Sequence, residues 1–417
     1  MDFFECMEFG KAQELIDDRL GKNIVGSERV ELLLALGRVT AEEIRAREDM
    51  PPFARSTVDG YAVRSADTFG ANDAAAALFE LIGEIAMGQA ASMEIVPGTA
   101  VAIPTGGMLP PGADAVVMLE YAEQPDGQTL LVQRMVAPNE NVIVRGEDIA
   151  AGALIVKAGI QITPRHIGML AACGCQQLMV RKKIKVALIS TGDELVDISE
   201  IPAVGQIRDV NSYSLSALLT EMGCAVEPFG IIKDSYERFL DCLMKAVADC
   251  QMVVISGGSS VGTKDFTIPA IQALPGPGIM MHGLAVKPGK PTIFAMTGSV
   301  PIFGLPGHPV AAFMVCSQLV ARAVQRLNGM QPADHPNNGS PAVLSRNIAS
   351  APGRDDFVNV RLVPQANGCA AEPLIGKSGL LMVLMQSDGV VHIPAGKSGL
   401  YKGETVIVQT MTAGAER

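Results

Sequence analysis

Glycine, serine and lysine residues gather in four short segments whose composition suits the binding of an oxyanion. Glycines allow backbone N–H groups to approach an anion closely, and serine hydroxyls supply further hydrogen-bond donors. A pair of lysines around a Pro-Gly turn adds positive charge. The segments are "STGDEL" (190–195), "SGGSSVGTKD" (256–265), "KPGK" (287–290) and "GLPGHP" (304–309).

The second segment nearly matches the Walker A phosphate loop, G-x-x-x-x-G-K-[ST]. Gly257 and Gly262 have the required spacing, but the next two residues, Thr-Lys, stand in the reverse order. Taken alone, the segment is equally consistent with an ordinary turn, and an exposed turn is the commoner interpretation of KPGK. If the segments converge, we expect an intact loop for a different phosphate group, with Lys287 and Lys290 replacing the Walker lysine.

Carboxylates accompany these segments and suggest a divalent cation beside the anion. Asp193, Glu194 and Asp265 stand within the glycine-rich segments. Magnesium takes oxygen ligands from carboxylates and phosphates together, so the combination favours Mg²⁺. Asp193 and Asp234 are also consistent with helix caps or turn formers.

A second set of polar residues lies in the N-terminal half of the chain. "RSTVDGYAVR" (55–64) contains Asp59, "PTGGMLPPGADAVV" (104–117) is rich in turn residues, and "VRGEDIAAG" (144–152) contains Asp148. To act with the first set, these residues have to meet it across a domain or subunit boundary. Without such a boundary they are surface turns and a salt-bridge cluster.

The first set lies in a region, residues 183–327, that alternates strands and helices. "IKVALIS" and "MVVIS" are uninterrupted apolar runs, typical of strands that are covered on both faces. This alternation predicts a mostly parallel sheet with helices on both sides, and ligands bind at the carboxyl ends of such strands. Helices are expected from about 212, over 236–249 and over 309–326, with further strands at 225–232, 292–295 and 301–304.

The remaining regions differ in character. Residues 9–20 and 28–36 have helical spacing, and so has the stretch 154–180, which contains "TPRHIGMLAACG". Residues 50–140 alternate short apolar runs with Pro/Gly turns, which predicts a β-rich insertion. Residues 328–341 are typical of a linker, and the segments after it predict a small β domain.

The acidic composition excludes several classes of partner. The 417 residues carry a net charge of −11, and aromatic residues make up 4% without any Trp. Such a chain is a poor partner for nucleic acid, so a bound anion needs locally concentrated positive charge. The N-terminus has no signal-peptide pattern, and turn residues interrupt the uncharged stretch 291–321. We expect a cytoplasmic protein with no membrane span.

Cysteine and histidine do not form a recognisable site. The eight cysteines are scattered, so we expect neither a disulfide framework nor a zinc site. The five histidines have no mutual spacing that suggests a metal site or a triad, and neither G-x-S-x-G nor H-E-x-x-H occurs.

Taken together, the motifs resemble those of the molybdopterin molybdenumtransferases, the MoeA-type family that includes the E domain of gephyrin. Their order is the order in that family, and the resemblance covers about residues 9–410. The motifs are "STVDGYAVR", "PTGGMLPPGADAVV", "VRGEDIAAG", "STGDEL", "SGGSSVGTKD", "VKPGKP", "GLPGHPVAAF" and "PGRDDF".

The resemblance implies a multidomain fold of the α/β plus β class and an elongated homodimer with the active site at the subunit interface. In that arrangement Asp59 and Asp148 face the α/β domain of the other subunit. The implied domains are a helical base (1–48 and 142–179), a β-rich insertion (49–141), a central three-layer α/β domain that binds molybdopterin on a mostly parallel sheet (180–329), and a C-terminal small β-barrel-like domain (330–417).

The implied activity is the insertion of molybdate into adenylylated molybdopterin, with release of AMP and with Mg²⁺ as cofactor. Molybdate is then a substrate, and the partners are adenylylated molybdopterin and a second copy of the chain, without nucleic acid or membrane. Three alternatives stay open: an adenylyltransferase-like enzyme with the same α/β module, a tungstate-preferring homologue, and a non-catalytic pterin-binding scaffold. The embedded α/β module and the retained carboxylates and lysines favour the transferase.

The resemblance also assigns roles to individual residues. The catalytic positions are Asp59, Asp148, Glu194 and Asp265, of which Asp59, Glu194 and Asp265 are also the implied metal ligands. Within the substrate-binding set, the residues from the SGG segment cradle the pterin phosphate, the lysines form an anion pocket, and the last two match positions associated with molybdate. The full set is Thr191, Asp234, Gly257, Gly258, Ser260, Gly262, Lys287, Lys290, Pro291, Pro306, Arg354 and Ser378.

The chain departs from the usual family pattern at several positions around these motifs. Ser259 replaces a valine, Ala311 replaces a serine whose hydroxyl could bind an anion, and "TGGM" stands in place of TGAP. His308 stands where many members have Asn, and Gly283 where some have lysine. These differences bear on the fine structure of the molybdate pocket rather than on the overall reaction.

Overall fold

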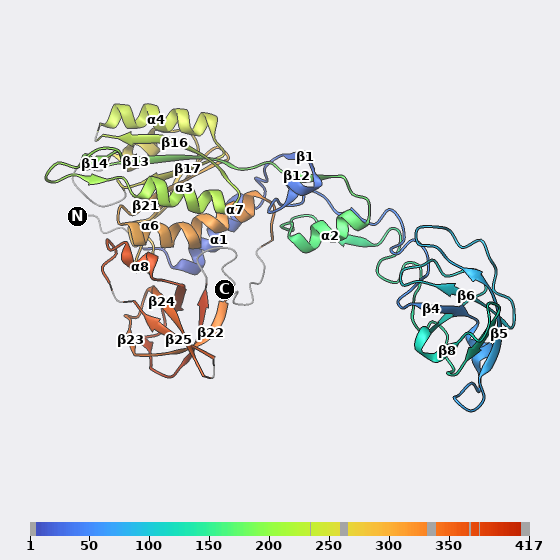
Figure 1. Cartoon of the computed structure of the whole chain (residues 1–417). Coiled ribbons are helices and arrows are strands. Elements are labelled where there is room, and N and C mark those ends of the chain that lie inside the picture. The colour runs from blue at the N-terminus through green and yellow to red at the C-terminus, as the bar shows by residue number, and fades with distance from the viewer. Residues whose placement is uncertain are drawn as a thin grey trace.

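The molecule is elongated, with an α/β sheet and a C-terminal barrel at one end and a separate β-rich lobe at the other (Figure 1). A smaller middle part, around α2, connects the two ends. The structure is a computed structural model, and it describes residues 6–233, 235–258, 266–331, 339–366, 368–374 and 376–409.

The α/β end is built on a six-stranded mixed sheet. The first four strands in its order are parallel to their neighbours, whereas the last two pair antiparallel, so the predicted mostly parallel sheet has an antiparallel edge. The edge strand β18 was not predicted. In order across the sheet the strands are β16 (Ala225–Ile232), β13 (Lys185–Thr191), β17 (Met252–Ser256), β21 (Val300–Leu305), β20 (Ile293–Thr297) and β18 (Gly278–His282).

Helices cover both faces of this sheet because its strands are apolar on both faces. Successive side chains of a strand point to opposite sides. Ala187 and Ile189 therefore pack with α4 and α5, while Val186 and Leu188 pack with α3, α6 and α7. The helices are α3 (Asn211–Glu221), α4 (Tyr236–Asp249), α5 (Thr267–Ala273), α6 (Pro309–Val315) and α7 (Ala321–Leu327).

The helix predicted over 309–326 is present, with a π-helical segment η4 (Cys316–Val320) between α6 and α7. The combined helix, Pro309–Leu327, is long and apolar enough to cross a membrane by length and composition alone. Most of it is buried in the core beneath the sheet, with Ala312, Leu319 and Ala323 fully buried. A core helix of this kind passes the same test as a membrane helix, so the feature does not argue for a membrane span.

The first helix, α1 (Phe9–Leu20), packs on α7 and so belongs to the core of the α/β end. The sequence grouped this segment with 142–179 instead. Its apolar residues recur at helical spacing, and Ile16 and Leu20 are fully buried in the same cluster as the sheet. Asp17 accepts two hydrogen bonds from the Arg322 guanidinium, at 3.0 and 2.5 Å, which fixes α1 on α7.

The middle part contains less helix than predicted. Residues 28–36, expected as a helix, form β1 (Ser27–Glu31) and a short 3-10 turn η1 (Leu32–Ala35). The prediction was wrong because β1 pairs residue by residue with β12 (Gln177–Arg181), a partner that lies far away in the sequence. The helix predicted from "TPRHIGMLAACG" is α2 (Pro164–Ala172), which starts with a Thr163 capping box.

Two further two-stranded ladders complete the connection to the distal lobe. Each pairs a segment from before residue 60 with one from after residue 140, so the chain leaves and re-enters the middle part side by side. The ladders join β2 (Ile44–Arg45) with β11 (Leu154–Val156) and β3 (Arg55–Ser56) with β10 (Val142–Ile143).

The distal lobe confirms the predicted β-rich character of residues 50–140. Its sheet has six strands, and two apolar clusters form its core, one of them around Phe79 and Leu130. In order the strands are β7 (Ala115–Met118), β4 (Gly60–Val63), β6 (Thr99–Ile103), β5 (Ala77–Glu84), β9 (Thr129–Val132) and β8 (Ala122–Glu123), with short 3-10 turns η2 (Ser65–Thr68) and η3 (Leu119–Tyr121).

The C-terminal part is a closed five-stranded barrel, as the β-barrel-like prediction required, because β24 pairs with both β25 and β26. Its strand β25 was not predicted. The ring consists of β24 (Asp355–Gln365), β25 (Gly368–Pro373), β22 (Gly339–Leu344), β28 (Thr405–Gln409) and β26 (Gly389–Ile393), with β23 (Ile348–Ala349), β27 (Gly399–Leu400) and α8 (Met382–Met385) in its connections.

The eight cysteines are all free, which confirms that they form no disulfide framework. Burial raises the pKa of the Cys224 thiol to about 12. A thiol of this kind stays protonated at neutral pH and acts as a small apolar core residue.

Replacement of Ile16 by Ala tests whether α1 is part of the α/β core. We expect the free energy of unfolding to fall by about 2–5 kcal/mol, because a fully buried side chain leaves a cavity. The measurement is urea unfolding followed by circular dichroism. Lys11→Ala, on the exposed face of the same helix, is the control and is expected to change stability by less than about 0.5 kcal/mol. An equal effect of both variants would contradict this placement of α1.

Candidate functional site

Three of the four predicted segments meet at the carboxyl edge of the α/β sheet. Strands β13, β17 and β21 are parallel neighbours, with Ser190 opposite Ser256 and Ser256 opposite Leu305. Thr191, Gly257 and Pro306 are at or just after these strand ends, so they share one edge. These three segments therefore converge at one edge, and the fourth, KPGK, lies beside β19, which pairs with the barrel.

The turn after β17 accepts only glycine at its first two positions. Gly257 and Gly258 have φ angles of +92° and +62°. A Cβ atom on Gly257 would lie 2.5 Å from the carbonyl oxygen of Thr191, and one on Gly258 would lie 2.4 Å from Oγ1 of Thr267. The backbone is thus held close against the end of β13. Ser260, Gly262, Asp265 and Asp234, also predicted for this site, lie outside the described residues.

A buried polar network at the start of α3 supports this edge, and the sequence analysis missed it. Asn211 donates from Nδ2 to Oγ of Ser256 and to the carbonyl oxygen of Gly307, both at 2.8 Å, which ties two of the segments together. Ser212 bridges Ser190 at 2.7 Å and the buried Asp209 carboxylate at 2.6 Å. The signal in the sequence was the run "RDVNSYS", whose Asp and Asn fall just before the predicted helix.

Glu194 lies beyond the end of β13 and is exposed. The turn that carries it is held by Lys233, whose Nζ donates to the backbone carbonyls of Asp193 and Leu195 at 3.1 and 2.7 Å. The next strands, β14 (Leu195–Val196) and β15 (Ile207–Arg208), form a small parallel ladder beside it. The Glu194 carboxylate is therefore available at the same edge as the glycine turn.

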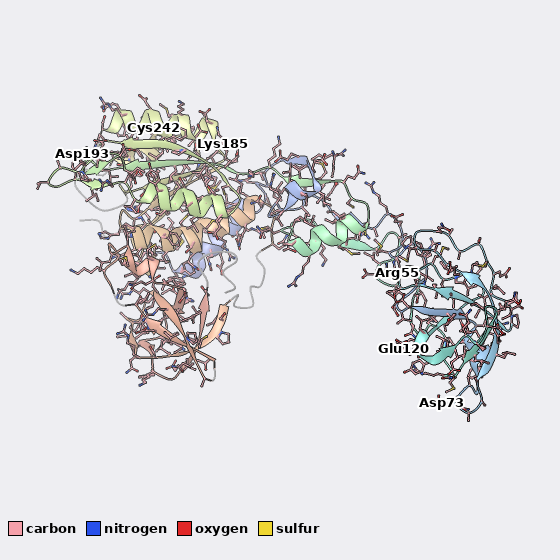
Figure 2. The ribbon with its side chains drawn as sticks, in the orientation of Figure 1. Arg55, Asp73, Glu120, Lys185, Asp193 and Cys242 are labelled. Atoms are coloured by element: carbon pink, nitrogen blue, oxygen red, sulfur yellow. The ribbon has the colours of Figure 1, made fainter. Side chains whose placement is uncertain are left out.

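Asp59 and Asp148 lie in a different region of the molecule. Asp59 follows β3 in the distal lobe, where its carboxylate accepts the Thr105 N–H at 2.8 Å. Figure 2 shows Arg55, on the chain just before Asp59, at the opposite end of the molecule from Asp193. One chain therefore does not bring Asp59 to Glu194. Asp148 is exposed in the turn that connects the lobe to the middle part.

The "VRGEDIAAG" turn is held by Asp49. This carboxylate accepts the Ala151 N–H at 2.8 Å and pairs with Arg145 at 2.7 Å. These two interactions, the backbone hydrogen bond first, hold the pKa of Asp49 below its usual range. Arg145 of this segment therefore pairs with a carboxylate from outside the segment, Asp49.

Within one chain the structure does not assemble the implied metal site. Among the described residues, no three His, Cys, Asp or Glu side chains are close enough to hold a metal ion. Of the implied ligands Asp59, Glu194 and Asp265, the first two lie at opposite ends and the third lies outside the described residues. The oxygen chemistry of the set suits Mg²⁺, but only if a second subunit completes it.

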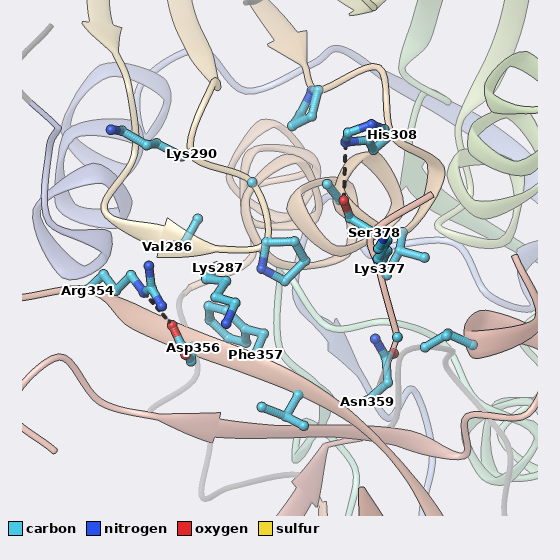
Figure 3. A pocket seen from close by; sticks show the side chains of 18 of the residues that line it. Val286, Lys287, Lys290, His308, Arg354, Asp356, Phe357, Asn359, Lys377 and Ser378 are labelled. Atoms are coloured by element: carbon cyan, nitrogen blue, oxygen red, sulfur yellow. Dashed lines mark hydrogen bonds and ion pairs between the residues drawn. The ribbon is translucent and has the colours of Figure 1, made fainter. Parts of the chain in front are cut away.

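A cavity of about 1180 Å³ lies between the α/β end and the barrel. Its walls come from the KPGK turn, the loop after β21, strand β24 and residues 376–383 (Figure 3). It brings together half of the predicted substrate-binding set. These six residues are Lys287, Lys290, Pro291, Pro306, Arg354 and Ser378.

Among the described residues, four cationic side chains and one carboxylate line this cavity. Lys377 joins Lys287, Lys290 and Arg354, and the carboxylate is Asp356, which pairs with Arg354 at 2.9 Å. In a chain with a net charge of −11, this is the local concentration of positive charge that anion binding requires. Lys377 was not among the predicted site residues, although it is the neighbour of Ser378 in the sequence.

The cavity is held in shape by contacts between its two walls. Strand β19 (Val286–Lys287) pairs in parallel with β24, with Lys287 opposite Asp356. On the other side, the Ser378 hydroxyl is 3.1 Å from Nδ1 of His308, and the Ser378 carbonyl accepts the Val310 N–H at 3.1 Å. His308, which departs from the family pattern, therefore joins the last predicted residue to the start of α6 (Figure 3).

Fold and site together define a class: a multidomain protein in which a mixed α/β sheet with a glycine-rich edge meets a closed barrel across a cationic cavity. Three family models match it in succession. They are the MoeA N-terminal region (domain I and II) over residues 7–174, the probable molybdopterin binding domain over 187–326, and the MoeA C-terminal region (domain IV) over 341–411.

Relatives match over almost the whole length. A putative molybdopterin biosynthesis protein of Methanocaldococcus jannaschii is 34% identical over 414 residues, which is 97% of this chain and 96% of that protein. A molybdopterin molybdenumtransferase of Haemophilus influenzae is 30% identical over 385 residues, or 92% and 93% of the two chains. A solved molybdopterin biosynthesis MoeA protein of Pyrococcus horikoshii is 31% identical, covers 96% and 99%, and has a TM-score of 0.83.

This chain belongs to the molybdopterin molybdenumtransferase (MoeA) family. The resemblance inferred from the sequence motifs is thereby confirmed, and so is the prediction that the protein is an enzyme of the transferase class.

Replacement of Gly289 by Ala tests whether the KPGK turn must pack tightly for the cavity to bind an anion. Gly289 has φ +122°, and an added Cβ would lie 2.5 Å from Cγ2 of Val315 in α6. We expect stability to fall by about 2–4 kcal/mol, from backbone strain and overpacking together, with weaker molybdate binding in calorimetry.

Gly353→Ala is the matched control for this variant. Gly353 lines the same cavity and also has a positive φ, +90°, but a Cβ there meets nothing within 4 Å. We expect it to lose only about 1–2 kcal/mol and to keep its anion affinity. Equal molybdate binding by both variants would show that the packing of the turn does not set the cavity's affinity.

Proposed function

We propose that this protein inserts molybdate into adenylylated molybdopterin and releases AMP, in the cytoplasm. The observation that carries the proposal is the cationic cavity next to the glycine-rich sheet edge. It occurs in a chain similar, over almost its full length, to proteins named molybdopterin molybdenumtransferase. The reaction needs two neighbouring anion sites, one for a phosphate-bearing pterin and one for molybdate.

The sheet edge is the proposed site of the pterin phosphate. Gly257 and Gly258 expose backbone there. In this proposal Thr191, Asp234, Ser260 and Gly262 also contact the phosphate. Backbone N–H groups and hydroxyls of this kind bind a phosphate without a Walker lysine. Such preorganised donors also stabilise the charge that develops when the phosphoanhydride bond breaks, and removal of one donor typically costs about 3–4 kcal/mol of barrier.

The cavity between the sheet and the barrel is the proposed site of molybdate. Lys287, Lys290 and Arg354 supply positive charge, and Ser378 supplies a hydroxyl donor. Pro291 and Pro306 line the same cavity and shape its wall. Tungstate has nearly the same size and charge, so this set of side chains does not by itself separate the two ions.

The carboxylates belong, in this proposal, to a site shared between two subunits. An elongated homodimer would let Asp59 and Asp148 of one chain approach Glu194 and Asp265 of the other, which a single chain does not allow. Asp59, Glu194 and Asp265 would then hold Mg²⁺, which would neutralise phosphate charge in the reaction.

We further propose the four-domain division expected from the sequence, with three layers in the α/β domain. Separate apolar clusters support it for the lobe, the middle part and the barrel. In this proposal residues 9–20 join the α/β domain, and the packing of α1 on α7 supports this change from the expected helical base (1–48 and 142–179).

The reaction is tested by incubating the protein with adenylylated molybdopterin, Mg²⁺ and molybdate, and by measuring AMP release and cofactor formation. We expect AMP release that depends on molybdate. Formation of adenylylated molybdopterin and pyrophosphate from molybdopterin and ATP would instead favour an adenylyltransferase-like enzyme, and pterin binding without any AMP release would favour a scaffold. A parallel reaction with tungstate separates the tungstate-preferring alternative. Asp265→Ala is expected to bind the pterin and to lose turnover.

The shared site is tested by mixing two inactive variants, Asp59→Ala and Glu194→Ala. If each site takes Asp59 from one subunit and Glu194 from the other, a mixed dimer has one intact site. Random mixing should then restore about a quarter of the wild-type rate, because about half of the dimers are mixed. If each site lay within one chain, mixing would restore nothing. Sedimentation as a monomer would also contradict the proposal.

A further inference from the structure

Asn359 is a buried polar side chain in the wall of the cationic cavity, and none of the sequence motifs assigned it a role. It lies on β24 between Val358 and Val360 and is only 7% exposed. Its carbonyl accepts the Leu374 N–H at 2.9 Å, and its strand pairs with β26, where Asn359 lies opposite Val390. The side chain is thus not needed to hold the strand.

The Asn359 carboxamide has no partner that explains its burial. Its Oδ1 is buried and has no hydrogen-bond partner among the described residues. Buried polar atoms are almost always paired, and an unpaired one destabilises the folded state. Figure 3 shows the carboxamide directed into the cavity, below Lys377 and Ser378 and on the same side as Lys287. An oxyanion only accepts hydrogen bonds and cannot pair with Oδ1, whereas Nδ2 at the same end of the side chain is a donor that can meet such a ligand.

We propose that Asn359 contacts the tetrahedral oxyanion of the cavity, molybdate, and donates a hydrogen bond to it from Nδ2. This inference rests on the proposed function of the cavity and adds a specificity-determining residue to it. A carboxamide is neutral, so it adds a donor without further repulsion among the four cations that line the cavity. Lysine ammonium groups are mobile point charges, whereas Asn359 is fixed on a strand of the closed barrel. It can therefore set the position of the bound ion.

The matched control is Asn347, the same residue type on the rim of the same cavity. Asn347 is exposed, and its Oδ1 accepts the Lys402 N–H at 2.7 Å, so its carboxamide already has a structural partner. A structural asparagine and a ligand-binding asparagine respond in opposite ways to the isosteric change to leucine. The first loses stability, and the second loses binding while the free protein becomes no less stable.

The experiment compares the full-length wild type with Asn359→Leu, Asn359→Asp and Asn347→Leu. Each is titrated with molybdate by calorimetry, and each melting temperature is measured without ligand. We expect Asn359→Leu to weaken molybdate binding about 10- to 100-fold while its melting temperature stays equal or rises. Asn359→Asp should weaken binding further, because a carboxylate repels the dianion. Asn347→Leu should melt lower and bind like the wild type.

Four results would overturn the proposal, and they are distinguishable. Wild-type molybdate affinity in Asn359→Leu would show that Asn359 does not contact the ion. A lower melting temperature in that variant would show that Asn359 has a structural role. If Asn359→Leu loses more affinity for inorganic phosphate than for molybdate in a parallel titration, Asn359 contacts the substrate phosphate instead of molybdate. A wild-type protein that binds no molybdate overturns the assignment of the cavity itself, and the proposed function with it.

Discussion

The pairing of β19 with β24 is the interaction on which the site depends. It is only two residues long, Val286 and Lys287 against Asp355 and Asp356, but it joins the α/β end to the barrel. Because the pairing is parallel and in fixed register, it places Lys287 beside the Arg354–Asp356 ion pair. Apolar packing supports this pairing: the rings of Phe9 in α1 and Phe357 in β24 meet edge to face, with their centroids 5.1 Å apart. The cavity forms because this pairing and packing hold the α/β end and the barrel side by side.

Charge is distributed unevenly in this acidic chain, and the uneven distribution favours anion binding in the cavity. Most carboxylates are exposed to water, where their mutual repulsion is screened. The cavity instead gathers lysine and arginine side chains around one paired carboxylate, in a partly closed space where screening by water is weaker. An anion is therefore attracted to this cavity although the chain as a whole is acidic. The neutral Asn359 in the same wall adds hydrogen-bonding geometry to that charge.

The elongated shape separates the two sets of carboxylates that the motifs predicted together. The lobe with Asp59 connects to the rest through paired two-residue ladders, so it stands away from the sheet edge with Glu194 (Figure 1). A single chain thus has an incomplete set at each end. Because these carboxylates have no common location within one chain, we interpret them as parts of a site shared between two copies.

The sequence by itself determined the local elements and the chemistry of the segments. Continuous apolar runs identified β13 and β17, amphipathic spacing identified α4 at its observed bounds, and glycines identified the turn after β17. These features depend on neighbours along the chain. Distant partners explain where the prediction differs: β1 is a strand rather than a helix because β12 pairs with it. The position of α1 also depends on a distant partner, because it packs on α7. Tertiary structure alone brought Lys377 and Asn359 into the cavity, since burial without a partner is a property of the folded state and not of the residue.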